Sequence, residues 1–459
     1  MIDDSGSDAE RFYRERDRRT SDYLRNGFPV HTSVSVHASH DACESRSGQL
    51  ILVTLVNQLA RIHRQIHIAL AAPYAPLLTP DVCGGSNLGD EISRLACRID
   101  PFGKFDVDGE QGTPNKISIG IGGQCQPGLN WYLGCNRSVA AIARTPCVLG
   151  SNVSADLRGA GLAALLGAAA VTKCALGIDT APTTLSAWNL KDGVDAAVGP
   201  ESLPRVDVGQ GLMIGAGAVA SAAVYWLKQW GSKSTWAILD RDQIKLHNTN
   251  RCLLFFPDQA AQPNKRGVAK ALCLAQHLPD AVGVCEWYHQ TQEARQSFDM
   301  VLVLANEFNV RTLVSSRNDP IQLQATTGRS WLSQLHRHIV GRDGCVRCRM
   351  SDIRTPQFSC SEASTATAEQ PTRPDAALPF LSAASGLMLV TAMQRLQLKE
   401  FGANETNVWN WDFRNSLRMD SSGRYACRND CSTILAPNAR KRIAARTRWK
   451  DAPWLPITR

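Results

Sequence analysis

The chain has 459 residues, a formal net charge of +8 and 44% hydrophobic residues, enough material for two folded domains. The charge is modest for this length, and no pattern of stacking aromatic residues accompanies it, which argues against a nucleic-acid-binding function. The 15 cysteines lie without framework spacing, which excludes a disulfide scaffold and indicates a reducing, cytoplasmic compartment.

The first half begins with an arginine-rich segment, residues 11–19, whose charge density is typical of a solvated helix face. Apolar runs between residues 34 and 71 predict strands and helices, but no glycine-rich turn accompanies them. Residues 117–123 predict a further strand that enters a tight turn.

Two segments rich in alanine, glycine and leucine, residues 158–173 and 379–394, predict helices. Their length raises the question of a membrane span, but charged and proline-rich flanks favour buried packing helices and no membrane contact. Because one such helix lies in each half, we interpret residues 1–200 and 201–459 as two domains related by a degenerate repeat.

The second half carries a nucleotide-binding pattern. Residues 211–214 predict a buried strand, and the turn Gly215-Ala-Gly217 after it lets the backbone approach a phosphate at a helix N-terminus. The next strand ends on Asp240, a carboxylate that can bind a ribose hydroxyl. This pattern alone suits a nicotinamide or flavin cofactor as well as ATP.

The residues that follow favour ATP. Cleavage between the α- and β-phosphates needs amide donors and cations on the departing pyrophosphate, and Asn248, Arg251 and Lys265 supply them. A second carboxylate, Asp242, lies two residues after Asp240.

Taken in order, the Gly-x-Gly-x-x-Ala turn, Asp-x-Asp, Asn-x-x-Arg and the lysine resemble the ubiquitin-activating and ThiF-type adenylyltransferases. The resemblance spans roughly residues 208–432 and implies two Rossmann-like α/β adenylation domains, the first inactive. It also implies that Asp240 holds the ribose, Asn248 and Arg251 hold the phosphates, and Lys265 holds the α-phosphate.

Two further expectations come from the resemblance. Such enzymes usually place a magnesium-binding aspartate where this chain has Asn306, followed by Glu307. A neutral amide is a poorer ligand for Mg²⁺, so Glu307 or Asp242 substitutes, or ATP itself holds the metal. The inactive partner domain often supplies an arginine to the phosphates; Arg11 and Arg14 are the candidates, with Arg14 assigned as catalytic.

Four cysteines stand in two short knuckles, Cys345 with Cys348 and Cys427 with Cys431. This arrangement predicts a tetrahedral zinc site, which would be structural because four thiolates leave no position open for water. The alternative is four unrelated core cysteines.

Cys360 lies in a polar segment without apolar periodicity, about residues 350–376, which predicts a loop. By the resemblance, this segment is a mobile catalytic loop and Cys360 collects the activated acyl group as a thioester, with Arg354 lowering the thiol pKa. Two extra residues separate Cys360 from the preceding proline, compared with the family pattern. The alternative is a loop thiol without a role.

The sequence thus predicts an enzyme that adenylates the C-terminal carboxylate of a ubiquitin-like protein and passes it through Cys360 to a conjugating enzyme. The compact two-half plan resembles bacterial conjugation systems of the Bil antiphage type, and a homo-oligomer is compatible with it. Two alternatives stay open: delivery of the acyl-adenylate to a sulfur donor, and a scaffold or redox protein that retains only the fold. The basic segment 440–450 is expected to be a docking tail or a solvated end, with Trp449 and Trp454 available as anchors.

Overall fold

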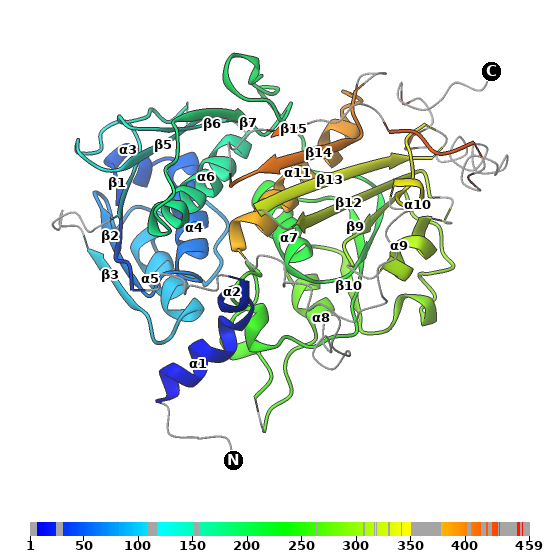
Figure 1. The fold of residues 1–459 in the computed structure, drawn as a ribbon, viewed down its shortest axis with the longest axis horizontal. Helices are drawn as coiled ribbons and strands as arrows, with labels where there is room; N and C mark the ends of the chain where they lie inside the picture. The colour runs from blue at the N-terminus through cyan, green and yellow to red at the C-terminus, as the bar shows by residue number, and fades with distance from the viewer. Residues whose placement is uncertain are drawn as a thin grey trace.

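The computed structural model describes most of the chain, namely residues 7–23, 31–108, 117–150, 156–262, 264–305, 308–315, 317, 319–328, 331–340, 342–349, 378–401, 405–414, 419–420, 425–429, 431, 448–449 and 452. Each half forms its own sheet, and the two sheets lie on opposite sides of a central group of helices (Figure 1).

The first half forms a seven-stranded sheet in the order β3-β2-β1-β4-β5-β6-β7. Strands β3 to β5 of that order are mutually parallel, and β6 and β7 add antiparallel at one edge. Its strands are β1 (Val34–Ala38), β2 (Gln65–Leu70), β3 (Lys104–Asp108), β4 (Ile117–Ile121), β5 (Trp131–Asn136), β6 (Val139–Ala143) and β7 (Thr183–Ser186). Its helices are α1 (Asp8–Arg16), α2 (Arg18–Tyr23), α3 (His40–Cys43), α4 (Arg46–Leu59), α5 (Leu88–Ile99), α6 (Arg158–Ala175) and the 3-10 turn η1 (Gly193–Asp195).

The second half forms an eight-stranded sheet in the order β10-β9-β8-β11-β12-β13-β14-β15. Its strands are β8 (Gln210–Ile214), β9 (Thr235–Leu239), β10 (Ala281–Val284), β11 (Met300–Val303), β12 (Ile321–Gly328), β13 (Leu332–Ile339), β14 (Val408–Asp412) and β15 (Met419–Asp420). Its helices are α7 (Ala218–Trp230), α8 (Lys270–Ala275), α9 (Phe308–Ser315), α10 (Val346–Arg349) and α11 (Pro379–Gln397), with 3-10 turns η2 (Leu246–Asn248), η3 (Pro257–Gln259) and η4 (Tyr288–Gln290).

The seven strands of the first sheet match the first seven strands in the order of the second, which adds β15 at its edge. Both place the first strand of the half between the second and fourth, and both change from parallel to antiparallel pairing after the fifth strand of the order. This confirms the predicted fold class of two Rossmann-like α/β sheets, and the shared order is what a duplicated unit would give.

Small residues let the central helices approach closely. A Cβ added at Gly161 of α6 would lie 2.8 Å from the Trp226 ring of α7, and one at Gly386 of α11 would lie 2.7 Å from Ala222. Across the two halves, Thr54 of α4 and Tyr225 of α7 share a hydrogen bond of 2.7 Å. The two small-residue helices are therefore buried packing helices, as expected.

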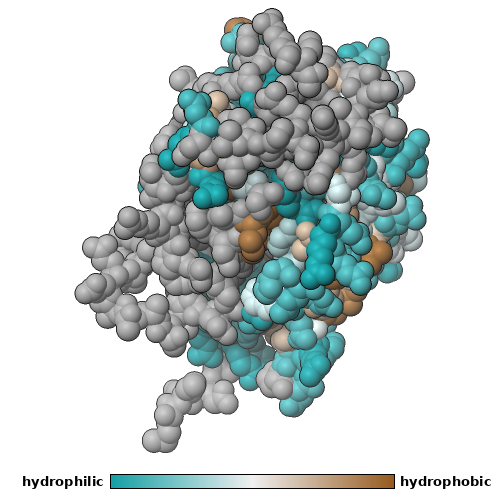
Figure 2. All heavy atoms as spheres, turned by 90° about the vertical axis from the view of Figure 1, so that its right-hand side faces the viewer, coloured by the Kyte–Doolittle hydropathy of each residue, from teal (hydrophilic) through white to brown (hydrophobic). Residues whose placement is uncertain are grey.

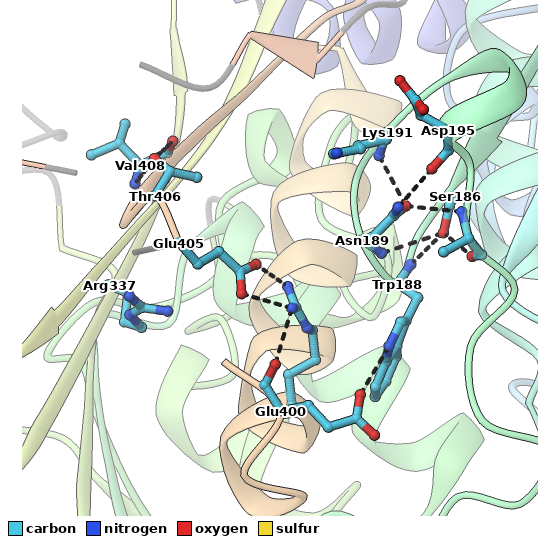
Figure 3. Close-up of polar contacts among 12 residues, drawn as sticks. Ser186, Trp188, Asn189, Lys191, Asp195, Arg337, Glu400, Glu405, Thr406 and Val408 are labelled. Atoms are coloured by element: carbon cyan, nitrogen blue, oxygen red, sulfur yellow. Dashed lines mark hydrogen bonds and ion pairs between the residues drawn. The ribbon is translucent and has the colours of Figure 1, made fainter. Parts of the chain in front are cut away.

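A second contact between the halves lies at the far end of α11 (Figure 3). The Trp188 indole of the first half donates to Glu400 at 3.1 Å, and Arg395 binds Glu405 through both terminal nitrogens at 2.6 and 2.9 Å. The loop after β7 is thus tied to the second half by the buried Trp188, which binds the exposed Glu400 and lies 5.9 Å from the Arg395 guanidinium.

The N-terminal helices are attached to both halves. On α1, Arg16 is fully buried and ion-pairs with Asp100 at 2.9 Å, while Tyr13 donates to the same carboxylate. The arginine-rich segment is therefore only partly a solvated face. Beyond α2's start, Thr20 accepts a hydrogen bond of 3.1 Å from Asn250 of the second half.

Among the described residues visible in Figure 2, apolar residues form separate spots between hydrophilic ones. Among the described residues, no helix is long and apolar enough to cross a membrane. Near the end of the chain, Trp449 is buried and donates to the Asp299 carbonyl at 3.1 Å, so it anchors the tail as expected. Trp454 lies outside the described residues.

Candidate functional site

The glycine turn lies between β8 and α7. Gly215 has φ +93°, and a Cβ there would lie 2.7 Å from the backbone nitrogen of Ala305, so only glycine fits without strain. Gly217 caps α7 with no side-chain hydrogen bond, and a Cβ there would meet nothing within 4 Å. The first amides of α7 are therefore left for an anion such as a phosphate.

Asp240 follows β9 and joins this turn to the next one. Its carboxylate accepts a hydrogen bond from the Ala216 amide at 2.7 Å and another from the Asp242 amide at 2.8 Å. Burial raises the pKa of Asp240, and the neighbouring Lys270 opposes that rise. Each carboxylate oxygen retains a second lone pair with which it can accept a ribose hydroxyl.

Lys270 is a functional residue that the sequence interpretation missed. It begins α8, is 8% exposed, and its amine lies 2.9 Å from the Asp242 carboxylate. Burial lowers the pKa of Lys270, but Asp240 and Asp242 outweigh burial, so the net pKa is raised and the amine stays cationic. The signal that the sequence offered for Lys270 was its position at the start of the apolar helix that follows.

Lys265, the lysine assigned from sequence, lies elsewhere. Its side chain is exposed, and its amine donates to the Asp258 carbonyl at 3.2 Å. The structure therefore brings Lys270, not Lys265, next to the Asp240–Asp242 pair.

Asn248 and Arg251 share one tight turn. The Asn248 side chain caps η2 by accepting from the Lys245 amide at 2.9 Å, and Arg251 donates to the His247 carbonyl at 2.7 Å. Both residues thus shape the backbone that presents them.

Cations gather round His247. Burial and the charges of Arg251, Arg19, Arg18 and Lys245 together lower its pKa to about 3, so His247 is neutral at physiological pH. We refer to these four residues as the cation cluster. Such a group of cations suits a polyphosphate.

The cation cluster draws two members from the N-terminal segment. Arg18 and Arg19 belong to α2, whereas Arg11 and Arg14 are exposed on α1, and Arg11 ion-pairs with Asp8 at 2.7 Å. The N-terminal segment thus reaches the site through Arg18 and Arg19, and α1 packs against η2 beside them, so the assignment of Arg11 and Arg14 stays a prediction. Asn306, Glu307, Arg354 and Cys360 lie outside the described residues.

The corresponding place in the first half is built differently. After β1, Ser39 donates to the Ile121 carbonyl at 2.8 Å and also to Asp41, whose carboxylate accepts from the Gly123 amide at 3.3 Å. After β2, where the second half has Asp240, the first half has Ala71. Asp41, at the start of α3, would repel a phosphate, and Ala71 offers no carboxylate to a ribose.

The four knuckle cysteines form one cluster, with all four sulfurs within 4.8 Å of one another. The Sγ atoms of Cys345 and Cys431 are 3.7 Å apart, close to the value of about 3.8 Å for sulfurs placed tetrahedrally 2.3 Å from zinc. The hydrogen bond from Cys427 lowers the pKa of Cys345 to about 4, which favours a thiolate. The residues fit a structural Zn²⁺.

Two histidines of β13 support this cluster rather than bind metal. His336 Nε2 lies 2.9 Å from the Gly344 carbonyl, and His338 Nδ1 lies 2.8 Å from the Asp343 carbonyl. They hold the backbone that leads into Cys345, which is a structural role.

Purified protein is expected to contain one zinc per chain, measured by elemental analysis. Cys348→Ser should lose the metal and lower Tm by more than about 5 °C, because several kcal/mol of metal-coupled stability would go with it. Cys97→Ser, at an exposed cysteine outside the cluster, is the control and should retain the zinc. Metal-free protein with the wild-type Tm would contradict a structural zinc.

Comparisons with known proteins identify the family of the chain. No curated protein matches, but solved structures resemble the chain at low identity. One is Escherichia coli MccB with AMPCPP and MccA, with 13% identity and a TM-score of 0.35 over 49% of this chain and 66% of that one. Another is PaaA, with 10% identity and a TM-score of 0.32 over 48% and 65%. The chain thus spans just under two thirds of either protein. The model of the ThiF family matches residues 194–431, more than half of the chain, and the protein belongs to the ThiF family.

Proposed function

We propose that the chain activates the C-terminal carboxylate of a ubiquitin-like protein by ATP-dependent adenylation. ThiF membership supports adenylation chemistry and the use of ATP. The observation that carries the proposal is the meeting of a glycine turn and the Asp240–Asp242–Lys270 group at the carboxyl ends of β8 and β9, with the cation cluster around His247 in the segment that follows β9. This edge of an open α/β sheet is where nucleotides bind.

The reaction follows from these groups. A carboxylate oxygen of the substrate attacks the α-phosphorus of ATP, a new O–P bond forms, and the bond to the bridging oxygen breaks as pyrophosphate leaves with the electron pair. Lys270 is placed to neutralise charge on the α-phosphate, and the α7 amides with the cation cluster stabilise the leaving pyrophosphate. Mg²⁺, when bound with ATP, would neutralise phosphate charge, and Asp242 is the described carboxylate in this group that could contact it.

The first half takes no nucleotide in this proposal. Ser39 and Asp41 occupy the place that Gly215 and Gly217 occupy in the second half, and the ribose-binding carboxylate is replaced by Ala71. One chain therefore binds one ATP.

The acyl-adenylate would then react with Cys360. The thiolate attacks the acyl carbon, a C–S bond forms, the C–O bond to AMP breaks, and AMP leaves, so that a thioester is ready for a conjugating enzyme. The polar segment around Cys360 and the two-half plan support this step. The same plan supports a bacterial ubiquitin-like conjugation system of the antiphage type as the setting.

Replacing Lys270 by methionine is expected to lower kcat for ATP–pyrophosphate exchange by about 100-fold or more, as loss of a buried charge on a transition state does. Lys265→Met is the matched control and should change kcat by less than about threefold, because an exposed charge contributes little. Exchange assays on both purified variants decide the matter. The opposite order of effects would return the role to Lys265.

Replacing Asp240 by alanine should weaken ATP binding by roughly 10- to 100-fold, since an acceptor of charge-assisted hydrogen bonds is lost. Titration calorimetry should give one ATP site per chain in the wild type. Asp41→Ala, in the corresponding turn of the first half, should leave affinity and stoichiometry unchanged. Two sites per wild-type chain would refute an inactive first half.

Intact-mass analysis tests the thioester. With ATP, Mg²⁺ and a ubiquitin-like protein encoded beside the gene, wild type and the exposed-cysteine control Cys97→Ala should both form a thiol-sensitive adduct. Cys360→Ala should release pyrophosphate without forming it. Adenylate without an adduct in the wild type would favour transfer to a sulfur donor, and absence of pyrophosphate release would favour a scaffold.

A further inference from the structure

A buried arginine of the first half holds the turn that presents the phosphate-binding residues of the second half. Arg61 follows α4, is 2% exposed, and reaches across the junction to the backbone of residues 249–255. We propose that Arg61 is a positioning residue for adenylation, acting through this turn on Asn248 and Arg251. This inference rests on the proposed function.

The contacts are made by the whole guanidinium fork. Nη1 donates to the carbonyls of Thr249 and, at 3.1 Å, Phe255, while Nη2 donates to the Leu253 carbonyl at 2.9 Å. Nε donates to the Asn57 side chain of α4 at 3.0 Å, which sets the angle of the fork. Asn57 itself donates to the Leu253 carbonyl at 3.2 Å.

These contacts replace regular structure. The segment from residue 249 to 255 belongs to no helix or strand, and Thr249, Leu253 and Phe255 are wholly buried there. Buried carbonyls need donors, and Arg61 supplies one to each of these three. The ring of Phe256 lies 5.7 Å from the guanidinium and closes the site on one side.

The link to the chemistry is short. Thr249, one of the residues whose carbonyl Arg61 binds, stands directly after Asn248 and two residues before Arg251. Arg251 in turn donates to the His247 carbonyl. Movement of the turn therefore changes the direction of the Asn248 and Arg251 side chains. A displacement of about 1 Å in a group that contacts the reacting atoms can lower a rate by about 100-fold.

Charge alone does not explain the arrangement. Among the described residues, Arg61 donates to three backbone carbonyls and one amide oxygen, none of them a carboxylate. Three acceptors in a fixed fan suit the planar fork of arginine better than the single ammonium of lysine. Shape and donor count are therefore the features to vary.

Arg61→Met and Arg61→Lys should be compared with Arg158→Met. Arg158 is equally buried in the first half but pairs with Asp156 at 2.7 Å and lies 5.1 Å from the ring of Trp188, in the other junction (Figure 3 shows Trp188). Each variant is characterised by its Tm, by kcat and KM for ATP in pyrophosphate exchange, and by hydrogen–deuterium exchange over residues 246–256 without nucleotide.

Arg61→Met is expected to speed amide exchange in residues 246–256 and to lower kcat/KM for ATP by about 100-fold in the folded protein. Arg61→Lys should recover part of that loss, while Arg158→Met lowers Tm but keeps kcat/KM within about threefold of wild type, because it lies outside the turn. Where Arg61→Met does not fold, Arg61→Lys carries the test.

Wild-type kcat/KM in a folded Arg61 variant, or an equal loss in Arg158→Met, would overturn the positioning role. Different results would refute the proposed function and the positioning role of Arg61. A wild-type protein without pyrophosphate exchange would refute the proposed function, whereas amide exchange in residues 246–256 needs no substrate and still shows whether Arg61 holds the turn.

Discussion

The second half depends on buried hydrogen bonds across the junction, because its phosphate-binding turn has little regular structure of its own. Between η2 and η3, no helix or strand satisfies the buried carbonyls of Thr249, Leu253 and Phe255. Their donors are Arg61, which follows α4, and Asn57 of α4. Such donors are effective only where α4 itself is held. Close packing through small residues and the Thr54–Tyr225 hydrogen bond provide that support. The first half therefore supports the candidate site of the second half, whether or not it binds a nucleotide itself.

The charges at the site are arranged for an anion. The carboxylates of Asp240 and Asp242 keep Lys270 protonated in spite of its burial, and His247 stays neutral among four cations. Adding a polyphosphate would relieve repulsion within the cation cluster. A nicotinamide cofactor with two phosphates would neutralise less of the cluster's positive charge. Electrostatics thus favours the reading of the nucleotide as a reactant over the redox reading.

The sequence alone predicted those features whose geometry depends on the spacing of a few neighbouring residues. A glycine turn with a carboxylate at the next strand end, and two cysteine knuckles, are short patterns whose geometry is set by few backbone bonds. Lys270 and Lys265 lie five residues apart in one polar stretch, and only the start of α8 and its docking beside β9 distinguish them. The same holds for the arginine-rich segment, where burial of Tyr13 and Arg16 against Asp100 decides which arginines of α1 and α2 face the site. Arg61 left no sequence signal, because its partners are backbone carbonyls that any residue can provide.

The structural match of the two halves explains how the proposed loss of one nucleotide site would leave the fold intact. In the second half a carboxylate joins the glycine turn to the end of β9; in the first half Ser39 and Asp41 join the corresponding turn to the end of β4. The second half thereby satisfies the amides of Ala216 and Asp242, whereas the first half satisfies the Ile121 carbonyl and the Gly123 amide. Only the arrangement in the second half leaves the N-terminus of its helix open to a phosphate. The exchange of an anion site for internal hydrogen bonds preserves the sheet and its helices, and with them the α4 surface on which the other half relies.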